Sequence, residues 1–69
     1  MATRTIRVDG MACDGCERRV QAALEGLEGV ERASPDHERG RVEVHYDRAS
    51  VSTSDLERAI ADAGYDPRG

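Results

Sequence analysis

The stretch that decides the fold is RTIRVDGMACDGCERRVQAALEGL, residues 4–27. Residues 4–8 alternate polar and apolar side chains, which indicates a β-strand with one buried face. Residues 10–16 contain two glycines and predict a loop by composition. Beyond the loop, apolar residues recur with helical spacing, at Cys16, Val20, Ala23, Leu24 and Leu27. The stretch therefore predicts a strand, a cysteine-bearing loop and an amphipathic helix for which Gly29 is the natural stop.

The rest of the chain predicts two more strands, a second helix and a short last strand. These elements are a weak strand at 30–34, a clear strand at 41–46, a helix that begins within 52–55 and ends near 63, and a very short strand within 65–69. Ser52 and Ser54 both offer a capping box at the start of the helix. Pro35 and Pro67 mark the second and fourth strands as edge strands, because a proline cannot donate to a central ladder.

The order of elements decides the fold class. Strand, helix, strand, strand, helix, strand is the split βαβ or ferredoxin-like arrangement, an α+β fold with two helices on one face of a four-stranded antiparallel sheet. A chain of 69 residues has room for one small domain. We therefore expect a single domain over residues 1–69.

Composition excludes several classes of function. Fourteen acidic residues outnumber ten arginines, lysine is absent, and the formal net charge is −4. An acidic chain whose only aromatic residues are two tyrosines is poorly suited to bind nucleic acid. The sequence has no run of about 18 apolar residues, so we expect no membrane-spanning segment. We also see no apolar signal segment before the first strand, and we therefore expect a cytoplasmic protein. The acidic, lysine-free composition fits an ordinary solvated surface and a salt-adapted source equally well.

The cysteine pair carries the chemistry. Cys13 and Cys16 lie at a helix start, where free N–H groups and the helix dipole stabilise a thiolate. Reduced thiols at this spacing predict a metal or redox site, and we expect Gly10 and Gly15 to let the backbone bring the sulfurs together. Thiolates are soft ligands for Cu(I) or Zn(II). Two of them are too few for a closed zinc site but suffice for two-coordinate Cu(I), which leaves room for a third sulfur from a partner.

At these residues the chain resembles a known family. The segment GMACDGC, residues 10–16, is similar to the Gly-Met-x-Cys-x-x-Cys signature of heavy-metal-associated domains, which include small bacterial-type copper chaperones and the metal-binding domains of copper P-type ATPases. The similarity covers nearly the whole chain, with comparable residues at Leu24, 27–30, 42–47, Leu56, Ile60 and 63–65. It implies that Cys13 and Cys16 are the metal ligands.

The resemblance also implies roles for residues around the cysteines. Gly10 belongs to the signature, and Met11 packs beneath the loop in this family. Tyr65 matches the position where bacterial-type chaperones place a tyrosine close to the metal and eukaryotic-type ones often place lysine. Because this chain has no lysine, positive charge near the metal must come from Arg18, Arg19 or the helix N-terminus.

Metal and partner follow from the same resemblance. Zinc and cadmium members often have an aspartate just before the first cysteine, whereas this chain has Ala12 there and Asp14 inside the pair. This favours Cu(I), with Zn(II) or another soft metal as the alternative. The resemblance implies a carrier, not an enzyme, that hands Cu(I) to the metal-binding domain of a P-type ATPase. It would act as a monomer, with a metal-bridged dimer as the alternative.

Two other functions share some of these features. A dithiol oxidoreductase of the thioredoxin type also places a Cys-x-x-Cys pair at a helix start, but the order of elements and the lack of tryptophan disfavour it. An excised domain of a larger transporter is the other alternative. The initiating Met1 and the compact end near Gly69 favour a free-standing protein.

Several side chains have an ordinary structural interpretation beside a functional one. Met11 is a soft ligand or, as we prefer, a core residue. Asp14 is a weak oxygen ligand or, as we prefer, a helix N-cap or first-turn acid. Tyr65 caps the core or tunes the metal site. For His37 and His45 we expect solvated imidazoles, because neither lies near a second ligand in sequence.

Overall fold

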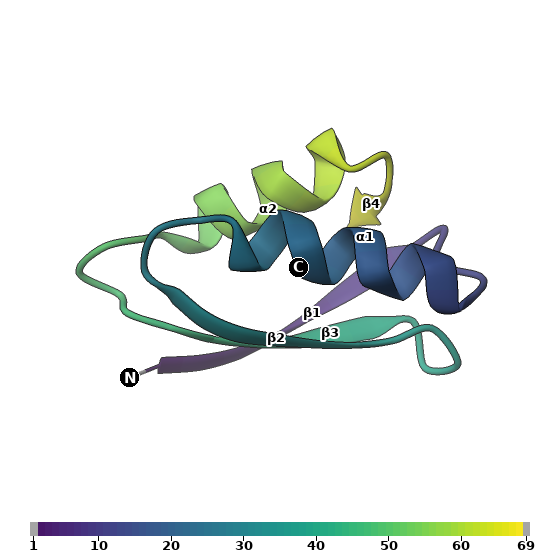
Figure 1. Ribbon diagram of the computed structural model, residues 1–69, viewed down its shortest axis with the longest axis horizontal. Coiled ribbons are helices and arrows are strands. Elements are labelled where there is room, and N and C mark those ends of the chain that lie inside the picture. The colour runs from purple at the N-terminus through teal and green to yellow at the C-terminus, as the bar shows by residue number, and fades with distance from the viewer. Residues whose placement is uncertain (1, 69) are drawn as a thin grey trace.

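The structure is a computed structural model that describes residues 2–68. Its elements are β1 (Ala2–Asp9), α1 (Asp14–Glu25), β2 (Val30–Asp36), β3 (Arg41–Tyr46), α2 (Thr53–Asp62) and β4 (Asp66–Pro67). Both helices lie on one face of the sheet (Figure 1). The βαββαβ order confirms the predicted ferredoxin-like α+β fold. Residues Met1 and Gly69, on which the free-standing interpretation depends, lie outside the described range.

The sheet has the strand order β2-β3-β1-β4, and every neighbouring pair is antiparallel. Strands β2 and β4 are therefore the edges, as the prolines predicted. Pro35 of β2 pairs with Val42 of β3. Pro67 of the two-residue β4 pairs with Val8 of β1. Strand β2 also contains a register shift between Val30 and Arg32. The central strands β1 and β3 thus carry most of the regular pairing.

The core lies between the sheet and the helices. Alternate residues of the two central strands point inward, and one face of each helix covers them. The largest fully buried side chains are Ile6, Leu24, Leu56, Ile60, Val8, Val20, Val42 and Val44. Val51, in the connector before α2, is also buried although the sequence pattern gave it no core role. Among residues 2–68, no helix has the length and apolar character needed to cross a bilayer.

Helix α1 ends earlier than its sequence suggests. Its last residue is Glu25, with Gly26 as the C-cap, so the expected stop at Gly29 was wrong. Gly29 serves the turn into β2 instead, where its φ is +100°. A Cβ at Gly29 would lie 2.6 Å from the Cβ of Ser50. The glycine is therefore required by a positive φ and by the close approach of the connector before α2.

Helix α2 begins with one of the two expected capping boxes. Ser52 Oγ accepts the Asp55 N–H at 3.3 Å, and Asp55 Oδ2 accepts the Ser52 N–H at 3.1 Å. The competing box at Ser54 is not used. This reciprocal pair satisfies two backbone donors and fixes where α2 starts.

Candidate metal centre

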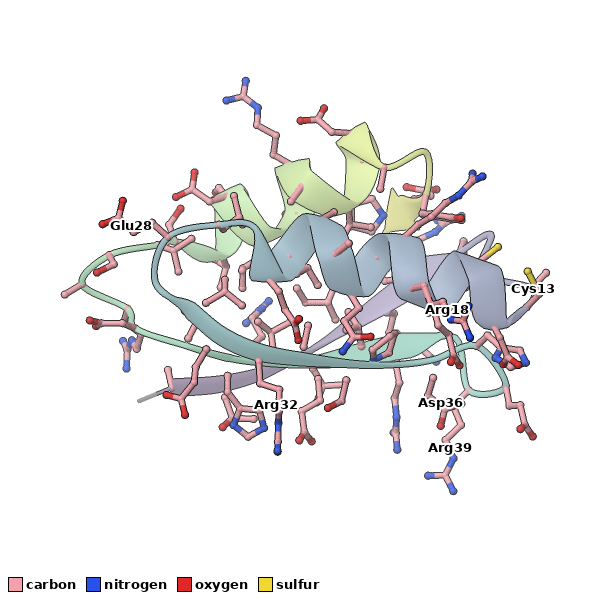
Figure 2. All side chains as sticks on the ribbon, viewed as in Figure 1. Cys13, Arg18, Glu28, Arg32, Asp36 and Arg39 are labelled. Carbon is pink, nitrogen blue, oxygen red and sulfur yellow. The ribbon has the colours of Figure 1, made fainter. Side chains whose placement is uncertain are left out.

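The two cysteines lie at the junction of β1 and α1. Gly10, with a φ of +98°, turns the chain out of β1. Cys13 is the N-cap of α1, and its carbonyl accepts the N–H groups of Cys16 at 3.1 Å and Glu17 at 3.2 Å. Figure 2 shows Cys13 at one end of the molecule. The helix thus begins inside the predicted loop. Of the two glycines expected to shape the loop, only Gly10 has a positive φ, whereas Gly15 lies within α1.

The sulfurs lie close together as free thiols. Cys13 Sγ and Cys16 Sγ are 3.4 Å apart, well beyond the S–S bond length of about 2.0 Å. Cys13 is exposed, whereas Cys16 is half-buried and packs against the hydrophobic core. One sulfur is therefore anchored by the fold, and the other faces solvent where a second protein can reach it.

The surroundings of Cys16 favour its thiolate. Its pKa is lowered to about 7, chiefly by a hydrogen bond from the backbone of Ala12, then by the Tyr65 hydroxyl and the Cys13 thiol. Each donor stabilises the negative sulfur, and partial burial opposes them. With a pKa near neutrality, Cys16 forms the thiolate, which is the form that binds metal, more readily than an ordinary cysteine does.

The end of α2 brings Tyr65 to this site. Gly64 has a φ of +98°, the Gly64 N–H donates to Ala61 O at 3.0 Å, and the Tyr65 N–H donates to Ile60 O at 3.2 Å. This is a Schellman motif, which reverses the chain and sends Tyr65 back toward the sheet. There it packs on the core, and a Cβ on Gly10 would lie 3.5 Å from its ring.

Tyr65 and Cys16 change each other's acidity. The pKa of Tyr65 is raised, first by its hydrogen bond to Cys16 and then by partial burial, while the positive charge of Arg19 opposes the rise. A phenol that donates to a thiolate resists losing its own proton. Arg19 therefore supplies positive charge near Tyr65 and Cys16. It is one of the sources of positive charge expected in a chain that has no lysine.

Replacing Tyr65 by phenylalanine should raise the pKa of Cys16. The substitution keeps the ring that packs on the core and removes the hydroxyl that donates to the thiolate. The measurement is a pH titration of the Cys16 ¹³Cβ chemical shift in the reduced protein. An unchanged midpoint in Y65F would contradict the hydrogen bond, and T53V, remote in the fold at the start of α2, serves as a hydroxyl-removing control.

Met11 and Asp14 lie beside the cysteines in different environments. Met11 is 7% exposed and belongs to the hydrophobic core. Asp14 is the first residue of α1, and its side chain is 83% exposed. Because Cys13 is the N-cap, Asp14 is a first-turn acid, which the helix dipole favours. The functional roles of both residues remain predictions.

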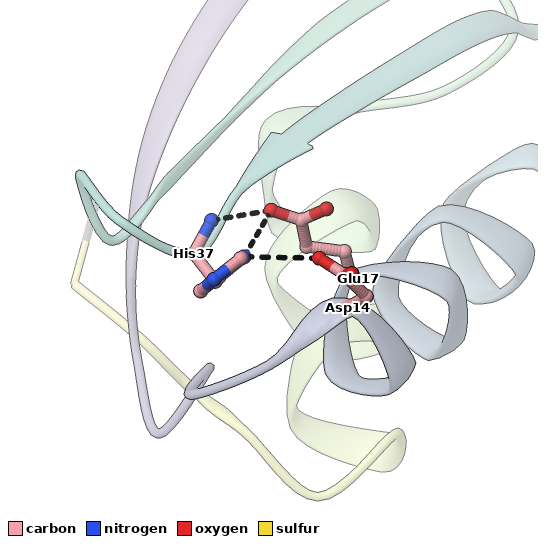
Figure 3. Close-up of side chains that lie close together, drawn as sticks. All are labelled: Asp14, Glu17 and His37. Atoms are coloured by element: carbon pink, nitrogen blue, oxygen red, sulfur yellow. Dashed lines mark hydrogen bonds and ion pairs between the residues drawn. The ribbon is translucent and has the colours of Figure 1, made fainter.

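His37 is not the solvated imidazole that we expected. Its backbone N–H donates to Glu17 Oε2 at 2.7 Å, and its Nδ1 lies 2.6 Å from the same oxygen (Figure 3). The side chains of His37 and Glu17 are only 26% and 24% exposed. The sequence places Glu17 on the polar face of its helix, and no local pattern links residues twenty positions apart. The interaction arises because the turn after β2 packs against the start of α1.

The two partners shift each other's pKa in opposite directions. The pKa of Glu17 is lowered, first by the His37 N–H and then by its imidazole, and that of His37 is raised by Glu17. A raised histidine pKa stabilises the fold below the unfolded value of about 6.5, and this contribution is lost as pH rises through the folded pKa. The pair therefore holds the start of α1 most firmly in mildly acidic solution.

His45 is also paired, on the face of the sheet away from the helices. Its Nε2 lies 3.1 Å from Glu43 Oε1, and its Nδ1 lies 3.3 Å from Thr3 Oγ1. Its side chain is 29% exposed. His45 is thus the surface imidazole that we expected, held by two exposed contacts because β1 and β3 place Thr3 directly opposite it.

The chain is similar over nearly its whole length to known metal-binding proteins. The model of the heavy-metal-associated domain matches residues 5–66. The copper chaperone CopZ of Staphylococcus saprophyticus is 46% identical over 66 residues, which cover 96% of this chain and 97% of that protein. A solved CopZ metallochaperone has a TM-score of 0.94 at 38% identity, covering 96% of this chain and 98% of its own. A copper-binding domain from HMA7, a P-type ATPase, has a TM-score of 0.96 at 34% identity, and the match covers 99% of this chain and 92% of that domain.

Proposed function

The chain belongs to the heavy-metal-associated domain family, and we propose that it is a Cu(I) chaperone with Cys13 and Cys16 as its two metal ligands. The observation that carries this proposal is the reduced sulfur pair, 3.4 Å apart, at an exposed helix start. Two thiolates match the softness of Cu(I) and leave its coordination shell incomplete. An incomplete shell suits a carrier that must release its metal, so we infer no catalytic role.

The position of the sulfurs supports binding with a small rearrangement. With metal–sulfur bonds of about 2.3 Å, the value for zinc thiolates, a linear site needs sulfurs about 4.6 Å apart and a trigonal three-sulfur site about 4.0 Å. The observed 3.4 Å must therefore widen by about 0.6 to 1.2 Å. Rotation of the exposed Cys13 side chain supplies that change while Cys16 stays packed on the core.

Release to a partner follows from the same asymmetry. A thiolate of the acceptor approaches Cu(I) from the solvent side and forms a three-sulfur intermediate with Cys13 and Cys16. Cys13 then dissociates first because it is exposed, and Cys16 follows once a second thiolate of the acceptor has bound, with Cu(I) unchanged in oxidation state. The acceptor we propose is a metal-binding domain of a P-type ATPase, because such a domain has nearly the same fold as this chain. Handover in the cytoplasm between monomers completes the proposal.

X-ray absorption on protein loaded with one equivalent of Cu(I) tests this function. We expect two short copper–sulfur distances and one tightly bound Cu(I) per monomer in competition with a chelator. Four sulfurs per metal, together with a dimer on size exclusion, would instead identify a metal-bridged pair. A Zn(II) affinity that exceeds the Cu(I) affinity under identical reducing conditions, and that is lost in C13S/C16S, would overturn the assignment of copper.

A further inference from the structure

A second group of metal-ligating side chains lies beside the cysteine loop. One ligand atom from each of Asp14, Glu17 and His37 lies within 4.8 Å of the other two. Figure 3 shows the three side chains converging from α1 and from the segment after β2. The proposed binding of Cu(I) at the thiols uses none of these three side chains, so they are available to bind a second metal ion.

The fold holds the three groups in place by different means. Asp14 and Glu17 are three residues apart on α1, so both project from the same side of its first turn. His37 is fixed against Glu17 by its backbone N–H, 2.7 Å from Oε2, as well as by its ring. Asp14 Oδ1 lies 3.7 Å from His37 Nδ1, and its side chain is 83% exposed and free to adjust. Glu17 and His37 are therefore preorganised, and the exposed Asp14 side chain can rotate to contact a bound ion.

The donor set selects the class of metal. One imidazole nitrogen and two carboxylate oxygens suit a borderline divalent cation such as Zn(II), whereas Cu(I) prefers sulfur. Three protein ligands plus water are also the usual composition of an open zinc site. We propose that Asp14, Glu17 and His37 form a Zn(II)-type binding site, distinct from the cysteine pair.

The distances need only a modest adjustment. In a tetrahedral site with bonds of about 2.1 Å, neighbouring ligand atoms lie about 3.4 Å apart. The 3.7 Å between Asp14 and His37 is close to this value. The 2.6 Å between His37 Nδ1 and Glu17 Oε2 is shorter, because a hydrogen is now shared there. The metal replaces that proton, which is released to solvent, and the ring moves away from the carboxylate by less than about 1 Å.

The test uses the full chain with both cysteines replaced by serine, so that thiolates do not bind the added metal. Titration of the C13S/C16S protein with Zn(II) alone should show one site per chain. Adding H37Q or D14N should weaken that affinity by at least about tenfold, since loss of even an outer partner of a zinc ligand costs about 10- to 100-fold. H45Q is the matched control, because His45 pairs with one carboxylate, Glu43, and should leave the affinity unchanged.

A second measurement keeps the proposal independent of protein stability. Co(II) added to C13S/C16S should broaden the NMR signals of residues 14, 17 and 37 and leave those of residue 45 sharp. D14N serves where H37Q fails to fold, because Asp14 is exposed. The proposal is overturned by the absence of a Zn(II) site in C13S/C16S, or by D14N and H37Q that bind as tightly as their parent. Neither outcome bears on Cu(I) binding by the wild-type thiols.

Discussion

Replacing Cys13 or Cys16 by serine should lower the affinity for Cu(I) by at least about a hundredfold. Four-ligand zinc sites in peptides bind with about 10–16 kcal/mol, or about 2.5–4 kcal/mol per ligand, which corresponds to about 60- to 700-fold. A two-ligand site depends even more on each sulfur, and a serine hydroxyl is a hard, poor ligand for Cu(I). Competition with a Cu(I)-specific chelator measures the loss directly.

The matched control for this experiment is M11L. Met11 is buried in the core, and leucine conserves its volume, so the variant should fold and bind Cu(I) as the wild type does. A large loss of affinity in M11L would identify the thioether as a third ligand. Retention of tight binding by both single cysteine variants would refute the assignment of the site, provided that their circular dichroism spectra are unchanged.

Replacing Leu24 by alanine should remove much of the stability of the domain. Leu24 is fully buried on α1, and truncation of such a leucine costs about 2–5 kcal/mol. Natural domains have about 0.05–0.15 kcal/mol per residue, so a chain of this length has only about 3–10 kcal/mol to lose. Urea denaturation followed by circular dichroism should show a much lower midpoint, with a partly unfolded population even without urea at the low end of this range.

L27A is the matched control for that substitution. Leu27 continues the apolar face of α1 in sequence, but it lies beyond the helix end and is only partly buried. Its truncation should therefore lower the midpoint much less than that of Leu24. Equal midpoints for the two variants would mean that the turn after α1 packs as tightly as the helix itself, contrary to the structure.

Local patterns predicted most of the fold correctly. The alternation in β3 and the helical spacing from Cys16 onward identify the apolar face of each element. That face must pack against the core, so the orientation of each element follows from its pattern. Pro35 and Pro67 added the edge positions because the missing N–H is a local property. The end of α1 was predicted wrongly, because Gly26 caps the helix while Gly29 lies in the turn into β2, close to Ser50.

The sequence by itself determined that the two thiols lie together. Two cysteines three residues apart at a helix start bring their sulfurs together through local geometry alone, so Cys13 and Cys16 could be identified without coordinates. Only the tertiary structure decided what surrounds them. The Schellman turn at Gly64 places Tyr65 beside Cys16, and the turn after β2 places His37 beside Glu17. Such contacts join residues far apart in the chain, and they depend on how helices pack on a sheet, which no local periodicity encodes.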